Sequence, residues 1–99
     1  MPVDQKIVDA LKLSDLKPRL PRNPRIVDIR VEDYVDTDGE DALLVWAILD
    51  EKVKPEKIDG QDVTDLKRAI HDRIRELGIE LWPYIRLVKQ SELDEDEEE

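Results

Sequence analysis

Apolar and polar side chains alternate along residues 25–35, and this two-residue period predicts a β-strand. Residues 42–49 form an unbroken apolar run, which is typical of a strand covered on both faces. Between the two segments lie Asp38 and Gly39, a pair that favours a tight reversal because glycine readily adopts a positive φ. We therefore expect a β-hairpin over residues 25–50, with its second strand in the centre of the sheet.

A different period begins after residue 60, where apolar residues recur at spacings of three and four positions. Such spacing puts them on one face of an α-helix. The predicted stripe comprises Val63, Leu66, Ile70, Ile74 and Leu77. Three aspartates, at positions 59, 62 and 65, suit the helix N-terminus, and Gly78 suits the position just beyond its end. The pattern predicts one long amphipathic helix.

Shorter elements are predicted towards the two ends of the chain. Asp4 is a candidate cap for a short helix that ends near Leu13. Residues 80–88 form a final strand, and Pro83 favours an edge position or the strand's beginning because proline cannot donate a ladder hydrogen bond. The expected order is α-β-β-α-β. It indicates an α+β fold, a three-stranded mixed sheet with the long helix on one face.

Charge is distributed unevenly along the 99 residues. The chain has 26 acidic and 16 basic side chains and a net charge of -10, and seven of the acids lie in residues 92–99. A run of like charges cannot bury enough apolar surface to offset its ordering entropy, so we expect a disordered acidic tail. The chain then divides into a helix and a Pro/Arg-rich extended segment over 1–24, one core domain over 25–91, and this tail.

Parity along the predicted strands separates two kinds of side chain. The odd positions are aliphatic and should pack beneath the long helix: Val27, Ile29, Val31, Leu43, Val45, Ala47, Leu49, Leu81, Ile85 and Leu87. The even positions hold every aromatic residue of the chain and form a candidate interaction face: Arg30, Tyr34, Leu44, Trp46, Ile48, Trp82, Tyr84 and Arg86. A face this apolar needs a cover, for which two alternatives remain open. The N-terminal helix folds across it, which we favour slightly, or a protein partner or second copy does.

A basic segment precedes the first strand: Lys17, Arg19, Arg22 and Arg25. Its three prolines predict an extended backbone. Lys67, His71 and Arg75 form a second basic row on the long helix. Either set could bind RNA or phosphate, but the acidic tail can reach and screen both, and the overall negative charge disfavours nucleic acid as a partner.

Residues that carry chemistry are sparse. Without cysteine the chain has no disulfide or thiolate metal site, which suits the cytoplasm. His71 has no nucleophile or carboxylate at a triad spacing, so we predict neither catalytic residues nor a cofactor. The acidic loop 36–41 lacks the glycine and glutamate positions of a calcium-binding EF-hand, and a plain turn is favoured over a metal site. No segment resembles a signal peptide or is apolar enough to span a membrane.

Two stretches, VEDYVDTDGEDALLVWAIL and ELWPYIRLVKQSEL, flank the long helix. With that helix they resemble a family of short, uncharacterised acidic bacterial proteins, some of them encoded next to HEPN-domain proteins in toxin–antitoxin or defence-like pairs. The resemblance covers about residues 25–93 and implies a small accessory or neutralising partner, without assigning a functional residue. We expect a non-catalytic protein-interaction module. The alternative is a single-stranded nucleic-acid binder that stacks bases on the aromatic face.

Overall fold

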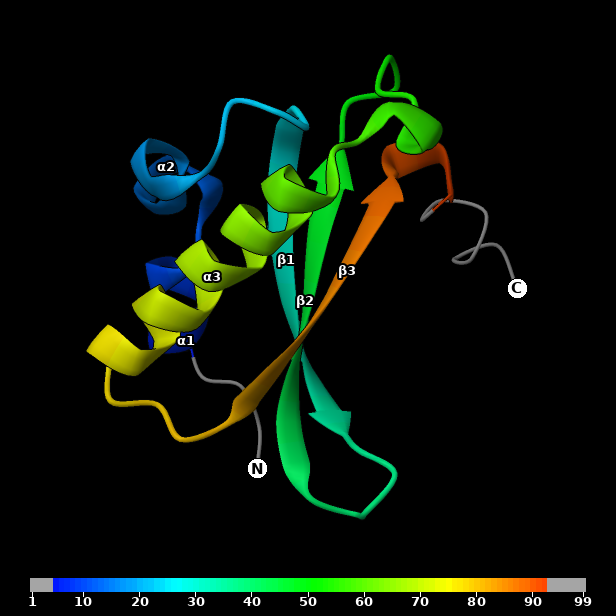
Figure 1. Cartoon of the computed structure of the whole chain (residues 1–99). Coiled ribbons are helices and arrows are strands. Elements are labelled where there is room, and N and C mark those ends of the chain that lie inside the picture. The colour runs from blue at the N-terminus through cyan, green and yellow to red at the C-terminus, as the bar shows by residue number, and fades with distance from the viewer. Residues whose placement is uncertain (1–4, 93–99) are drawn as a thin grey trace.

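Three strands form one mixed sheet, and three helices pack on one side of it (Figure 1). This computed structural model describes residues 5–92. The elements follow one another as α1 (Gln5–Ala10), α2 (Leu13–Leu16), β1 (Ile26–Val35), β2 (Asp41–Leu49), α3 (Gly60–Glu76) and β3 (Trp82–Lys89). Short 3-10 turns, η1 (Lys17–Arg19) and η2 (Pro55–Lys57), precede β1 and α3. The predicted α+β fold with a three-stranded mixed sheet and a long helix is confirmed.

The sheet has the order β1-β2-β3, so β2 is the central strand. β1 pairs with β2 in antiparallel fashion, with Arg30 opposite Trp46, and β3 runs parallel to β2, with Arg86 opposite the same residue. Pro83 lies at the second position of an edge strand, where its missing N–H is tolerated. The hairpin, the central β2 and the edge position of β3 all agree with the sequence pattern.

Helix α3 begins and ends where the sequence indicates. The Asp59 carboxylate accepts a hydrogen bond from the Gln61 backbone N–H at 2.8 Å and caps the first turn. At the other end Gly78 adopts a φ of 72°, a left-handed conformation that glycine takes without strain. Leu66, Ile70 and Ile74 are buried against the sheet, whereas Leu77 is exposed because the helix ends there.

The core lies between the helices and the odd-numbered face of the sheet. Its buried cluster comprises Leu11, Leu16, Ile29, Leu43, Val45, Ala47, Leu66, Ile70 and Ile74. Val31, Leu81, Ile85 and Leu87 pack around it, as the parity of the strands predicts. Val27 departs from the prediction and is 38% exposed. The register shifts between Ile26 and Asp28, and this irregularity turns Ile26 toward the core in place of Val27.

The N-terminal helices lie on the same side of the sheet as α3, so the prediction that they cross the aromatic face is wrong. Leu11 and Leu16 are 0% exposed within the core cluster, and Figure 1 shows α1 and α2 beside α3. Width explains this arrangement. Three strands span about 14 Å, whereas one helix is about 10 Å wide, so α3 alone leaves part of the odd-numbered face bare.

Side-chain contacts tie the N-terminal region to α3. The Arg73 Nε donates a hydrogen bond to the Ala10 carbonyl oxygen at 3.4 Å, and Arg19 in η1 forms an ion pair with Glu76. The segment before β1 includes a cis peptide bond between Asn23 and Pro24. The predicted disordered tail covers residues 92–99. Only Glu92 of this segment falls within the described residues, and the prediction therefore lies outside them.

Substitution of Leu16 tests the position of the N-terminal helices. Because Leu16 is fully buried against the core, Leu16→Ala is expected to lower the free energy of unfolding by about 2–5 kcal/mol, measured by urea denaturation. Val35→Ala is the control, since Val35 is 61% exposed and should change stability by less than about 0.5 kcal/mol. Equal, small effects of both substitutions would contradict this arrangement.

Candidate interaction surfaces

The even-numbered face of the sheet is turned away from the core that α1, α2 and α3 cover. We use the term aromatic face for Arg30, Tyr34, Leu44, Trp46, Ile48, Tyr84 and Arg86. The register confirms that these residues share one face: Arg30, Trp46 and Arg86 lie side by side across the three strands, and Leu44 pairs with Tyr84. Trp82, the eighth predicted member, has a different environment.

Two tyrosines form a bridge across the aromatic face. The ring centroids of Tyr34 on β1 and Tyr84 on β3 lie 5.2 Å apart, at an angle of 57° between the ring planes. These strands are the two edges of the sheet and stand about 10 Å apart, so rings in contact must lie over the central strand. The register puts them over Ala42 and Leu44. The Tyr84 hydroxyl also reaches an Asp36 carboxylate oxygen at 3.5 Å.

Trp46 lies at the centre of a second set of contacts on this face. Its indole Nε1 donates a hydrogen bond to the Glu32 carboxylate at 3.2 Å, and the Arg86 guanidinium carbon lies 5.9 Å from its ring centroid. A guanidinium over an indole ring is attracted by the ring's negative face. Each partner comes from a different edge strand, so Trp46 connects all three strands. Glu32 was missed in the sequence analysis, although its even position, two residues after Arg30 on β1, is a signal for it.

These contacts change the interpretation of the aromatic face. Leu44 is 8% exposed and Ile48 is 2% exposed, so the aliphatic residues of β2 are already buried on this side without a helix over them. The expectation that a helix or a second protein must cover them was therefore too strong. Surface atoms of the face come from tyrosine, tryptophan and arginine, in positions held by contacts with one another.

Trp82 leaves the aromatic face and packs against α3. Its ring centroid lies 4.8 Å from that of His71, in a T-shaped arrangement, and the side chain is 60% exposed. Trp82 is the first residue of an edge strand, where no strand on the outer side restrains the side chain. The prediction that Trp82 shares a surface with Trp46 and Tyr84 is therefore wrong.

His71 lies partly buried between Trp82 and its basic neighbours. Partial burial lowers the pKa of the imidazole from its ordinary value of 6.5, because desolvation disfavours the charged form. The nearby charges of Arg75 and Lys67 lower it further, and Asp72 acts in the opposite direction.

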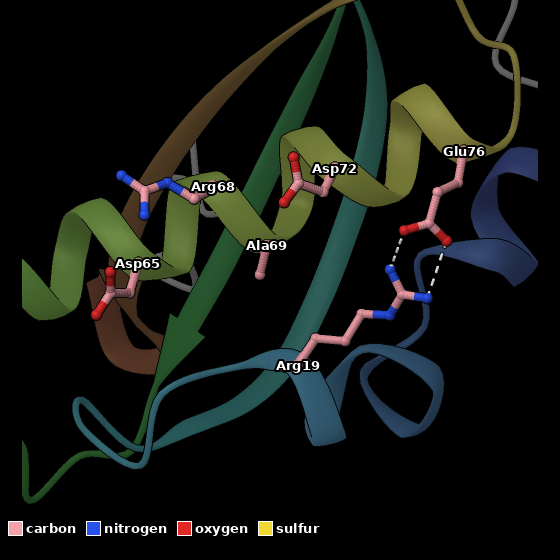
Figure 2. A pocket seen from close by; sticks show the side chains of 6 residues that line it. All are labelled: Arg19, Asp65, Arg68, Ala69, Asp72 and Glu76. Atoms are coloured by element: carbon pink, nitrogen blue, oxygen red, sulfur yellow. Dashed lines mark hydrogen bonds and ion pairs between the residues drawn. The ribbon is translucent and has the colours of Figure 1, made fainter.

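The basic segment does not act as one unit. Arg19 forms a bidentate pair with Glu76, which Figure 2 shows at one end of a pocket of about 260 Å³ on the flank of α3. The hydrogen bonds from Arg19 lower the pKa of the Glu76 carboxyl. Side chains of both signs line this pocket: Arg19, Asp65, Arg68, Asp72 and Glu76 surround Ala69. A pocket of mixed charge has no preference for an anion.

The other three cations of the segment line a separate pocket of about 300 Å³. Lys17, Arg22 and Arg25 surround it together with apolar side chains of Leu13, Leu20, Pro21, Pro24 and Ile26. Lys54 and Lys57 line an adjoining pocket that shares Pro24 and Arg25. These lysines were missed in the sequence analysis. The hairpin register is the available signal, since it brings the connector after β2 next to Arg25.

The acidic loop between β1 and β2 forms a plain turn. One Asp36 carboxylate oxygen accepts hydrogen bonds from the backbone N–H groups of Asp38 and Glu40 at 2.9 and 3.0 Å, and Gly39 has a φ of 81°. Among residues 5–92, no group of three or more His, Cys, Asp or Glu side chains is arranged to hold a metal ion. Near the same loop, burial and then the Asp36 charge raise the pKa of Tyr84.

Comparison of the chain with protein-family models, with curated proteins and with solved structures found no match. Functional inference therefore rests on the surfaces described above. Across the described part of the chain, no helix combines the length and the apolar character needed to cross a membrane.

Titration of the single histidine tests its environment. We expect the His71 imidazole, followed by NMR, to titrate with a midpoint below 6.5, and Trp82→Ala to raise that midpoint because it removes part of the burial. A lowered pKa in the folded state means that the unfolded chain binds the proton more tightly, so stability should fall as the pH drops below about 6.5. His71→Gln should remove this part of the pH dependence. A midpoint of the His71 titration above 6.5 would contradict the effect of burial on its pKa.

The tyrosine bridge can be tested by a double-mutant cycle. Tyr34→Ala and Tyr84→Ala should each lower the melting temperature, and the double variant should lower it by less than the sum, because the first truncation already breaks the shared contact. Tyr84→Phe is the matched control that keeps the ring. Strict additivity of the two alanine substitutions would show that the rings do not interact in solution.

Proposed function

We propose that this protein is a non-catalytic interaction module that binds another protein through its aromatic face. It acts in the cytoplasm as an accessory or antitoxin-like partner of a second bacterial protein. The observation that carries the proposal is the ordered cluster of Tyr34, Trp46, Tyr84 and Arg86 on the sheet face opposite the helices. Tyrosine, tryptophan and arginine are the residues most enriched among binding hot spots.

Preorganisation supports the same proposal. Each of these side chains contacts another: the tyrosine rings meet each other, and Trp46 bonds Glu32 and lies beneath Arg86. Side chains that are already held in place lose little rotamer freedom on binding, so more of the contact energy appears as affinity. The residues that reach the surface are thus suited to a specific interface.

Charge favours a basic partner. The protein carries a net charge of -10, and acidic side chains border the aromatic face at Glu32, Asp36 and Asp38. Complementary charge steers the encounter and sets its orientation. The resemblance to short acidic proteins encoded beside HEPN-domain proteins implies a protein partner. The packing of His71 against Trp82 gives the one histidine a structural role.

Trp46→Lys and Arg86→Glu test the proposed face. The tagged protein is cross-linked in its source cell, and the partner is identified and reconstituted. Each substitution should weaken its affinity at least tenfold, by calorimetry, because it removes a central contact. Val35→Lys is the matched control, since Val35 is an exposed apolar residue at an odd position. Unchanged affinity of both variants, with melting temperatures near that of the parent, would refute the proposal.

Variants of Trp46 also distinguish two other kinds of partner. If a second copy is the partner, light scattering will show a dimer that Trp46→Lys dissociates. If the face stacks single-stranded nucleic acid, the protein will bind an RNA oligonucleotide with an affinity that falls steeply with salt and with Trp46→Ala.

A further inference from the structure

A pocket lined by cations lies at the end of the sheet where β1 begins. Figure 1 shows that β1 starts at the end of the sheet where β2 and β3 finish. The pocket of about 300 Å³ described above opens beside it. None of its lining residues is acidic, and its wall combines three cations with leucine, isoleucine and proline side chains. It therefore suits a segment that carries both carboxylates and an apolar side chain.

Nearby acids leave the cationic character of this pocket intact. The Arg25 Nε lies 3.7 Å from an Asp50 carboxylate oxygen, which is a long ion pair. The adjoining pocket has two further cations, Lys54 and Lys57, and two acids, Asp59 and Asp62, of which Asp59 already caps α3. The pair formed by Arg19 and Glu76 belongs to another pocket. The lining of the pocket itself thus carries three cations, Lys17, Arg22 and Arg25, and no acid.

The C-terminal end of the described chain lies at the same end of the sheet as this pocket, on the other side of β2. The Ser91 backbone N–H donates a hydrogen bond to the Glu51 carboxylate at 3.0 Å, and the Asp50 N–H donates to the Arg25 carbonyl oxygen at 3.1 Å. Both contacts are made at the end of β2. Lys89 and Ile26 pair with the same residue, Leu49, from opposite sides, so about 10 Å separates β3 from β1 here.

Length and composition of the following segment fit the pocket. Residues 93–99 consist of one leucine and six acids, and seven extended residues span about 23 Å, more than the distance across the sheet. We propose that residues 93–99 bind in cis to the pocket lined by Lys17, Arg22 and Arg25, and that they exclude other polyanions from it. Of the two basic sites that the sequence offers, this pocket lies at the end of the sheet where β3 finishes.

Individual ion pairs at a surface are weak, but a tethered segment has an effective concentration in the millimolar range, which suits a contact of several weak pairs. Salt should release it because exposed charges are screened. The tail then acts as a competitor that an external anion must displace.

Spin labelling tests the contact, and the absence of cysteine permits a single site. A nitroxide on Glu97→Cys should reduce the amide signals of Leu20, Arg22 and Ile26 by more than half at 20 mM salt, and the signals should recover at 500 mM. The triple substitution Lys17→Gln, Arg22→Gln and Arg25→Gln should abolish the effect. The matched change on α3, at Lys67, Arg68 and Arg75, should leave it in place. Equal effects of the two triple variants would overturn the proposal.

Competition provides an independent measurement. A peptide with the sequence of residues 90–99 should bind at least tenfold more tightly to a full-length variant whose six terminal acids are changed to Asn or Gln than to the parent chain. Equal affinity for the two chains would overturn the proposal. The proposal would also be overturned if the parent chain bound RNA at 150 mM salt and neutralisation of the tail did not strengthen that binding. The pocket would then be open in the parent chain.

Discussion

The central strand β2 sets the main constraint on this structure, because its eight consecutive apolar residues from Ala42 to Leu49 must be kept from water on both faces. A chain of this size has few elements for the task. Helices cover one face, with Leu11 and Leu16 filling the width that α3 leaves bare. The other face is covered by side chains of the sheet itself. Both candidate binding surfaces follow from this division.

Strong periodic signals made much of the fold predictable. The hairpin, the limits of α3 and the edge position of β3 depend on alternation, a helical stripe and single residues such as Asp59, Gly78 and Pro83, all of which act locally. The side of the sheet on which the N-terminal helices pack was not predictable in this way. Leu11 and Leu16 are equally apolar on either side, and the choice depends on how wide the sheet is relative to one helix.

Site residues were predictable to a lesser degree for a similar reason. Parity identified seven members of the aromatic face but failed for Trp82, because the side chain of a terminal residue on an edge strand can turn toward a helix. Arg19 could not be separated from Lys17, Arg22 and Arg25 by sequence, since its partner Glu76 lies 57 positions away. Long-range pairs of this kind depend on tertiary structure, and the charge of a segment does not reveal them.

The contact between Tyr34 and Tyr84 has a consequence for the shape of the sheet. It joins the two edge strands, which share no ladder with one another, and so limits how far they can splay apart at the hairpin end. Curvature in this region is then controlled by two side chains as well as by the backbone ladder. Substitutions at these two positions could flatten or deepen the surface while every strand pairing stays the same. Related sequences could in this way fit partners of different shape.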